Sequence, residues 1–199
     1  MLITSDISAI VDLILQNKGA VIAYPTETVY GLGARIIDKA AISKIYRIKG
    51  RDSTKGMIVL IPTMEMAIEL AEIDSAQKRL LEHFWPGPLT AVAKAKRDLD
   101  SRLVQNGCIA IRISCDPHAR ALVDRVGPIT STSANMTGKP PARSPEGVLK
   151  YNLPVDGILD GGQTKARKPS TIIDLTRWPP VCIRQGKIPF SDIEGICAR

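Results

Sequence analysis

Side chains that can bind anions gather at the ends of apolar segments in this sequence. Hydroxyl groups follow one apolar run at Thr26 and Thr28, and hydroxyl and amide groups occupy residues 131–135 after another. Arg112 lies inside an apolar segment, where a charged side chain needs a partner. Open α/β sheets bind their ligands at strand ends. Cations beside hydroxyl and amide groups suit a nucleotide phosphate or an amino-acid carboxylate.

Each feature taken singly also has a structural explanation. Lys49 and Arg51 could stabilise the negative end of a helix. Residues 131–135 could form a turn whose side chains bond the backbone. The prediction of an anion site therefore depends on the combination of these features.

Several familiar catalytic motifs are missing. The sequence has no phosphate-binding G-x-x-x-x-G-K-[ST] loop and no G-x-S-x-G nucleophile motif, and paired catalytic carboxylates are not evident. Residues 31–33 (GLG) lack the third glycine of a dinucleotide fingerprint. Residues 75–78 match S-x-x-K, but Ser75 stands at a predicted helix start, where we expect it to cap the helix.

Strands and helices must position these residues. The apolar pattern predicts helices over 7–15, from 38 to about 49, over 63–72 and 75–84, and from 116 onward. It predicts strands over 20–24, 29–34, 57–61, 89–95, 108–114, 129–132, 157–159, 171–175 and 181–184, with a loop over 136–146. Interleaved strands and helices without a linker or repeat indicate a single α/β domain over residues 1–199, with a mixed sheet.

Composition limits the class of protein. The chain has 199 residues, a net charge of +7, 44% hydrophobic and 24% charged residues, which is typical of a globular protein with a modest preference for anions. No segment is long and apolar enough to span a membrane, and no secretory signal is evident. The four cysteines and two histidines lack the spacing of a zinc site, so no protein-bound metal is predicted. We therefore expect a cytoplasmic protein with reduced thiols.

Seven blocks extend the pattern from about residue 20 to 187. They are AYPTETVYGLG (23–33), KGR (49–51), WPGPLT (85–90), IAIRI (109–113), STSAN (131–135) with Gly138, STIID (170–174) and IRQG (183–186). In these blocks, and in their order, the sequence resembles the TsaC/YrdC family of threonylcarbamoyl-AMP synthases. The resemblance implies a twisted, mostly open mixed α/β sheet with a positively charged concave cavity.

The resemblance also implies a reaction. Family members condense L-threonine, bicarbonate and ATP into threonylcarbamoyl-adenylate and release pyrophosphate. Partner proteins then transfer the threonylcarbamoyl group to a tRNA adenosine. Such chemistry needs positioned anions and charge stabilisation instead of a covalent nucleophile, in agreement with the missing motifs.

Residue roles follow from the matched blocks. Lys49 and Arg51 are expected to be catalytic. The expected ATP-binding residues in the blocks are Lys49, Arg51, Ser133, Asn135 and Arg184. Ser53, near the KGR block, and Arg143, from its place in the proline-rich loop, are expected to bind ATP as well. The expected threonine-binding residues are Thr26, Arg112, Thr132 and Ser170. Mg²⁺ is expected on the ATP phosphates and not in a protein carboxylate cage.

Two departures from the family pattern fall beside the K-x-R block. Asp52 stands where many members have proline, and residues 53–57 differ from the common form, although they resemble the short bacterial branch. The chain also has no extension beyond residue 199, as expected for the short form of the family.

Two alternatives to the synthase stay open. One is an RNA-binding protein of the same fold, which the net charge would permit, although aromatic residues for base stacking make up only 4%. The other is a non-synthase member of the family, which would lack intact K-x-R and S-A-N blocks. Weak contact with tRNA is also possible for a synthase of this charge.

Overall fold

One mixed sheet organises the protein. The structure is a computed structural model that describes residues 1–50, 56–96, 98–164 and 168–197. Within these residues the sheet has eleven strands in the order β1-β9-β2-β3-β8-β4-β7-β5-β10-β11, with β6 beside β7. The strands are β1 (Leu2–Thr4), β2 (Ile22–Tyr24), β3 (Gly31–Gly33), β4 (Ile58–Leu60), β5 (Leu89–Lys94), β6 (Val104–Gln105), β7 (Cys108–Arg112), β8 (Ile129–Ser133), β9 (Gly157–Leu159), β10 (Thr171–Asp174) and β11 (Val181–Arg184).

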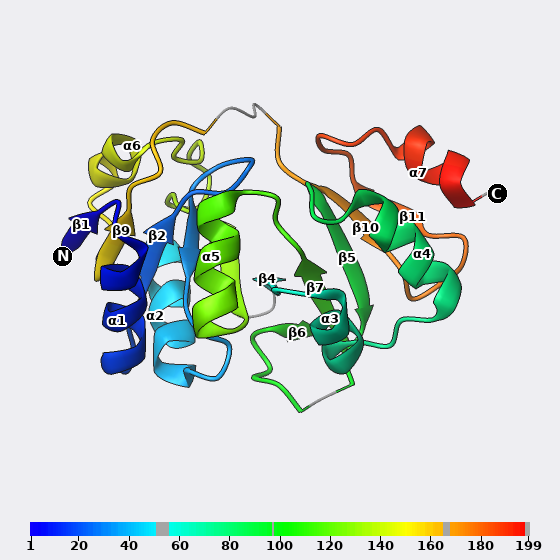
Figure 1. Cartoon of the computed structure of the whole chain (residues 1–199), viewed down its shortest axis with the longest axis horizontal. Helices are drawn as coiled ribbons and strands as arrows, with labels where there is room; N and C mark the ends of the chain where they lie inside the picture. Colours follow the sequence, from blue (N-terminus) through cyan, green and yellow to red (C-terminus); the bar gives the residue numbers. More distant parts are fainter. Residues whose placement is uncertain (51–55, 97, 165–167, 198–199) are drawn as a thin grey trace.

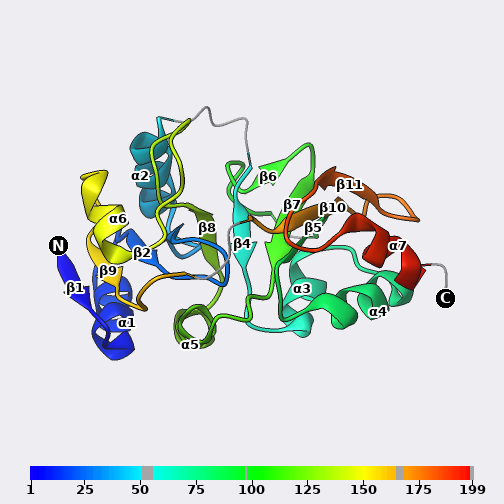
Figure 2. The ribbon, with the colours of Figure 1, turned by 90° about the horizontal axis from the view of Figure 1, so that it is seen from above.

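The strand pairing confirms the mixed, open α/β sheet expected from the sequence. Strand β9 pairs in parallel with β1 and β2, β4 with β7, and β5 with β10. The pairs β2–β3, β3–β8, β4–β8, β5–β7, β6–β7 and β10–β11 are antiparallel. Strand β8 therefore joins two halves of the sheet, since it pairs with β3 on one side and β4 on the other (Figures 1 and 2).

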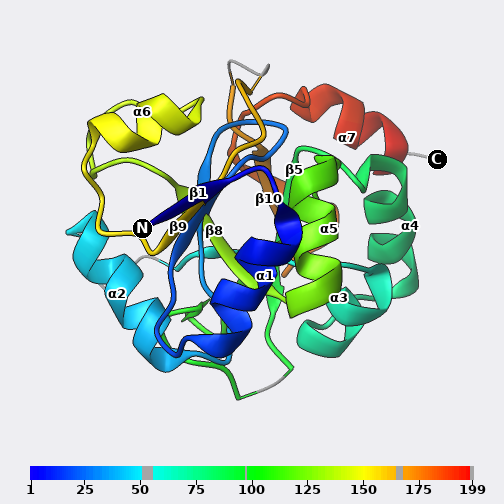
Figure 3. The ribbon, with the colours of Figure 1, turned by 60° about the vertical axis from the view of Figure 1, so that its left-hand side comes forward.

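Helices cover both faces of the half of the sheet that is formed by β1, β9, β2, β3 and β8. The helices are α1 (Ile7–Gln16), α2 (Lys39–Lys49), α3 (Met64–Leu70), α4 (Ser75–Phe84), α5 (Pro117–Val126), α6 (Pro145–Lys150) and α7 (Phe190–Cys197). Figure 3 shows β1, β9 and β2 between α1 and α5 on one side and α2 and α6 on the other. Helices α3, α4 and α7 lie with the other half of the sheet, which contains β4, β7, β5, β10 and β11 (Figure 1).

The residues of the β2 segment alternate between two cores. Val21 and Ala23 belong to the larger core with the buried face of α2, whereas Ile22 and Tyr24 pack with α1 and α5. All four are fully buried. A strand covered on both faces needs apolar residues at every position, which explains the uninterrupted apolar run in this segment.

Local sequence signals account for most helix ends. The Asp6, Asp38 and Asp116 side chains cap α1, α2 and α5 by accepting backbone N–H groups. Helix α2 ends at Gly50, whose φ of 52° is left-handed. The expectation that Ser75 caps α4 is wrong: Asp74 is the cap and forms a reciprocal capping box with Gln77, so Ser75 is the first helical residue.

Four short elements were not expected from the sequence. They are β1, β6, α6, which begins within the expected 136–146 loop, and α7. Each is short, so tertiary packing contributes more to its stability than local pattern does. Ile193, for example, is the fully buried residue that anchors α7 to the larger core. Within the described parts of the chain, no helix has the length and apolar character required to cross a membrane.

Candidate functional site

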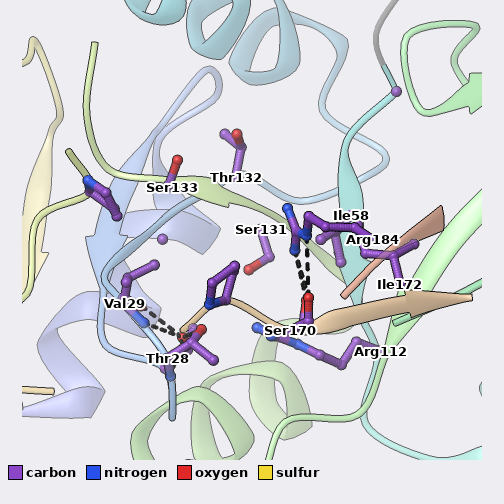
Figure 4. A pocket seen from close by; sticks show the side chains of 15 residues that line it. Thr28, Val29, Ile58, Arg112, Ser131, Thr132, Ser133, Ser170, Ile172 and Arg184 are labelled. Atoms are coloured by element: carbon purple, nitrogen blue, oxygen red, sulfur yellow. Dashed lines mark hydrogen bonds between the residues drawn. The ribbon is translucent and has the colours of Figure 1, made fainter. Parts of the chain in front are cut away.

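A cavity of about 530 Å³ lies where the two halves of the sheet meet. Its walls come from the β2–β3 loop and from residues at or beside β3, β4, β7, β8, β10 and β11 (Figure 4). Six of the residues expected at a ligand site line it: Thr26, Arg112, Thr132, Ser133, Ser170 and Arg184. The fold thus brings together side chains that are far apart in the sequence.

Arg112, the last residue of β7, is the most buried cation of the cavity, with 3% of its surface exposed. Its Nη1 lies 3.5 Å from Oε1 of Glu27. The guanidinium donates no hydrogen bond to any described residue, and its Nε is buried without a partner there. Buried polar groups are normally hydrogen-bonded, so a guanidinium with unused donors beside a cavity is prepared for an anionic ligand.

Arg184, at the end of β11, lines the cavity and is exposed to solvent. Its Nη2 donates to the Ser170 carbonyl oxygen at 2.9 Å and to Ser170 Oγ at 3.2 Å (Figure 4). Partial burial, and then the charge of Arg112, lower the pKa of Arg184. Because the two guanidinium groups repel each other, an anion bound between them is stabilised by both.

Ser170 and Thr26 contribute to the cavity wall in different ways. Ser170 is buried, and its Oγ forms a hydrogen bond with Thr90 Oγ1 at 3.0 Å. Thr26 Oγ1 donates to the Val29 carbonyl oxygen at 2.7 Å and accepts the N–H groups of Thr28 and Val29 at 3.2 Å. The Thr26 hydroxyl therefore fixes the conformation of the β2–β3 loop, which forms part of the cavity wall.

Lys49, the last residue of α2, reaches the loop that follows β8. Its Nζ donates to the Ser133 carbonyl oxygen at 2.7 Å, to the Asn135 carbonyl oxygen at 2.8 Å and to Asn135 Oδ1 at 2.6 Å. Asn135 Oδ1 also accepts from Ser133 Oγ at 2.6 Å. Thr137 Oγ1 donates to the Lys49 carbonyl oxygen at 2.6 Å. Lys49 is 94% buried. Its hydrogen bonds fix the conformation of residues 133–135.

Three of the expected site residues that the structure describes, Lys49, Asn135 and Arg143, do not line the cavity. Lys49 and Asn135 contact each other behind Ser133, which does line it. Arg143 donates from Nη2 to the Thr164 carbonyl oxygen at 2.9 Å. From the same loop, Pro141 lines the cavity and Arg143 does not. Arg51 and Ser53 lie outside the described residues. The phosphate contacts expected of Lys49, Arg51, Ser53, Asn135 and Arg143 stay predictions.

The cavity also contains residues that sequence reasoning missed. Ile58 and Ile172 add apolar contact surface. Thr28 and Ser131, which the sequence pattern noted without a ligand role, add buried hydroxyl-bearing side chains. Glu27, behind Arg112, is missing from the sequence prediction as well. The need for a partner for Arg112 was a usable signal, but nothing in the sequence selects Glu27 among the acidic residues.

The described lining consists mainly of groups that bind anions and of apolar side chains. Its described members include no cysteine, histidine or carboxylate. No cluster of three or more His, Cys, Asp or Glu suited to a metal ion occurs in the described parts of the chain. The lining instead combines two guanidinium groups with hydroxyl groups, an arrangement that binds and orients anions.

Comparisons with known proteins identify relatives of this chain. The family model named Sua5_yciO_yrdC and described as "Telomere recombination" matches residues 14–186. The threonylcarbamoyl-AMP synthase of Pyrococcus abyssi is 39% identical over 185 residues, which are 90% of this chain and 54% of that protein. The synthase of Histophilus somni is 34% identical over 187 residues, which are 91% of this chain and 100% of that protein.

Solved structures show the same fold. Sua5 of P. abyssi, solved in complex with L-threonine, superposes with a TM-score of 0.90 at 34% identity, over 98% of this chain and 61% of that one. E. coli YciO superposes with a TM-score of 0.84 at 29% identity, over 97% of this chain and 98% of that one. The chain spans about half the length of the Pyrococcus relative but the full length of the Histophilus one. On the extent of the sequence match and the shared fold, the chain belongs to the Sua5/YciO/YrdC family.

Proposed function

We propose that the protein is a threonylcarbamoyl-AMP synthase, a nucleotidyltransferase that condenses L-threonine, bicarbonate and ATP into L-threonylcarbamoyladenylate. The observation that carries this proposal is the cavity in which buried Arg112, with unused donors, lies near Arg184, while Thr132 and Ser170 contribute hydroxyl groups to the same lining. Such a cavity suits a hydroxyl-bearing amino acid whose carboxylate must lie close to a phosphate. Relatives named as this synthase support the same conclusion.

Threonine is assigned to the Arg112 end of the cavity. A guanidinium binds a carboxylate through two parallel N–H···O bonds, and Arg112 has donors available for them. Ser170 provides a buried polar group beside it (Figure 4), and Thr132 lines the same cavity. The threonine complex of P. abyssi Sua5, which has the same fold, supports a threonine site in this chain.

The proposed reaction needs no enzyme-bound intermediate. Threonine's amine and bicarbonate give an N-carboxy-threonine carbamate and water. A carbamate oxygen then forms a bond to the α-phosphorus of ATP while the bond to the bridging oxygen of pyrophosphate breaks. The protein's part is to align the two anions and to stabilise the charge that develops on the phosphoryl group and on pyrophosphate.

Arg184, Ser133 and the segment fixed by Lys49 are assigned to the nucleotide side. Arg184 is exposed to solvent, lies on the other side of Ser170 from Arg112, and can reach a phosphate while Arg112 holds the amino acid. Lys49 fixes Ser133 and Asn135 by three short hydrogen bonds, so it supports this side even where it does not touch the phosphate. Direct contacts of Lys49, Arg51, Ser53 and Arg143 with phosphates are part of the proposal.

Mg²⁺ is proposed to enter on the ATP phosphates. The described cavity lining offers guanidinium and hydroxyl groups and no carboxylate, which is a poor donor set for a protein-held Mg²⁺. The metal, when bound to ATP, neutralises phosphate charge.

We also propose that tRNA-modifying partner proteins accept the adenylate, that contact with tRNA is weak, and that the protein works in the cytoplasm.

The test is pyrophosphate release by the purified protein with ATP, Mg²⁺ and bicarbonate, with and without L-threonine. The proposal predicts release that depends on threonine. Pyrophosphate release that is absent, or equal without threonine, would show that the protein is not this synthase. Salt-dependent tRNA binding without any adenylate would support the RNA-binding alternative instead.

A further inference from the structure

Glu27 is a buried carboxylate that the proposed mechanism does not use. It lies in the β2–β3 loop between Thr26 and Thr28, and its side chain is 7% exposed. Its Oε2 accepts a hydrogen bond from Ser114 Oγ, which in turn accepts the Asp116 N–H group at 3.2 Å. Its Oε1 has no hydrogen-bond donor among the described residues and faces Arg112 Nη1 at 3.5 Å.

The Glu27–Arg112 contact joins distant parts of the sheet. Strands β3, β8 and β4 separate β2 from β7 in the sheet order. Adjacent strands lie about 4.8 Å apart, so these two strands would be far apart in a flat sheet. The β2–β3 loop nevertheless reaches Arg112, and Figure 4 shows Thr28, the neighbour of Glu27, and Arg112 at the same lower end of the cavity. Glu27 therefore connects the β2–β3 loop to Arg112 at the end of β7, from behind the cavity lining.

The geometry of the pair leaves the guanidinium donors available. At 3.5 Å the contact is an ion pair without a hydrogen bond, and Arg112 Nε is also without a partner among the described residues. Glu27 thus supplies opposite charge while the N–H groups that a ligand carboxylate would accept stay unused. Ser114 holds the far oxygen of Glu27, which fixes the carboxylate without involving Arg112.

Charge balance gives this pair a second consequence. Arg112 and Arg184 repel each other, and Arg184 forms no ion pair with any described residue. A buried guanidinium without a counter-charge is strongly unfavourable, so Arg112 would turn toward solvent if Glu27 were neutral. The orientation required for a bidentate contact with a carboxylate would then be lost.

We propose that Glu27 is a positioning residue that holds Arg112 in the orientation that binds the carboxylate of the amino-acid substrate. The inference rests on the proposed function, because it takes that substrate to be L-threonine. It assigns Glu27 no contact with the reacting atoms. Its effect is therefore expected on threonine and not on ATP.

The test uses Glu27→Gln, which keeps the size of the side chain and its acceptor for Ser114 but removes the charge. Threonine binding is measured by calorimetry without ATP, and the KM values for threonine and ATP by pyrophosphate release. We expect the Kd and KM for threonine to rise about tenfold or more, the loss that corresponds to about 1.4 kcal/mol. The KM for ATP should change less than about threefold.

Three further variants separate positioning from general stability. Asp100→Asn breaks an ion pair with Arg102 in which the aspartate side chain is equally buried, at 7% exposure, and which is not part of the cavity lining. It should lower Tm and leave the KM for threonine unchanged. Glu27→Asp keeps the charge and should recover part of the threonine affinity. Ser114→Ala should give a smaller loss that does not add to that of Glu27→Gln.

The outcomes distinguish this inference from the proposed function. The first outcome assumes that the wild-type protein is active. If Glu27→Gln then binds threonine as tightly as the wild type, or more tightly, the positioning role alone is overturned. Equal losses for threonine and ATP also overturn it, since they indicate a general structural role. A wild-type protein that neither binds threonine nor releases pyrophosphate overturns the proposed function and this inference together.

Discussion

Gly186 packs directly against the backbone that carries Ser170, and this contact makes the site sensitive to a single methyl group. A Cβ at position 186 would lie 2.4 Å from the Ser170 carbonyl carbon and the Thr171 nitrogen, and 2.5 Å from the Pro169 carbonyl oxygen. Ordinary contacts begin at 3.4 Å, so the two backbone segments must separate by about 1 Å in Gly186→Ala. The neighbours are backbone atoms, so a rotamer change cannot relieve the overlap.

This displacement acts on the anion site through Arg184, two residues before Gly186. The Arg184 Nη2 to Ser170 carbonyl distance of 2.9 Å would lengthen by a similar amount, beyond the range of a hydrogen bond. The bond from the Gly186 N–H to Thr171 Oγ1, at 3.0 Å, would also weaken. Misplacement of about 1 Å at a reacting centre costs on the order of 100-fold in rate, so we expect kcat/KM to fall by about that factor. Overpacking should also destabilise the fold by about 1–3 kcal/mol.

The assay compares kcat/KM for threonine-dependent pyrophosphate release with Tm by calorimetry. Gly195→Ala is the matched control, because this exposed glycine in α7 has no atom within 4 Å of an added Cβ. Alanine there should stabilise the helix by up to about 1 kcal/mol without changing the rate. A Gly186→Ala enzyme that retained its kcat/KM within about threefold would refute the proposed coupling between this packing and the site.

Three further predictions concern the anion site. Arg112→Lys removes the planar fork of donors, so the KM for threonine should rise about 10- to 100-fold in kinetic assays while circular dichroism stays unchanged; an unchanged KM would contradict the carboxylate contact. Lys49→Ala leaves the acceptors of Ser133 and Asn135 without their donor, so activity should be lost and stability should fall by about 1–3 kcal/mol in urea titrations. A variant with wild-type activity would exclude an essential Lys49. Removal of Mg²⁺ with EDTA should stop pyrophosphate release but leave threonine binding intact by calorimetry, and loss of threonine binding would point to a metal held by the protein.

The fold was largely predictable because its main segments carry strong local patterns. Residues 20–24 and 108–114 are apolar enough to indicate buried strands, and β2 and β7 occupy them. Elements such as β6 and α7 depend on contacts with distant segments, which a local pattern does not contain. The capping of α4 was assigned to the wrong residue because Asp74 and Ser75 are both good caps, and the reciprocal bond of Gln77 decides between them.

The candidate site was predictable in its residue types but less so in its connections. Arg112, Ser170 and Arg184, which were expected to bind substrates, line one cavity, and their substrate contacts stay predictions. Lys49 was expected at the phosphates, yet in the described structure its Nζ contacts Ser133 across 84 residues of sequence. Likewise Glu27 and Ser114 meet across 87 residues. Such pairs arise from the tertiary fold, and no spacing rule within one sequence identifies them.

The central claim is that threonine, bicarbonate and ATP combine in the cavity that Arg112 and Arg184 share. The most direct measurement follows carbon-labelled bicarbonate into a product that also contains threonine and AMP, separated by chromatography. The account predicts that label enters this product only when ATP and threonine are both present, and that Arg112→Ala and Arg184→Ala each abolish it. If either variant formed the labelled adenylate at the wild-type rate, the assignment of the cavity would be contradicted. If the wild-type protein formed none, the activity itself would be contradicted.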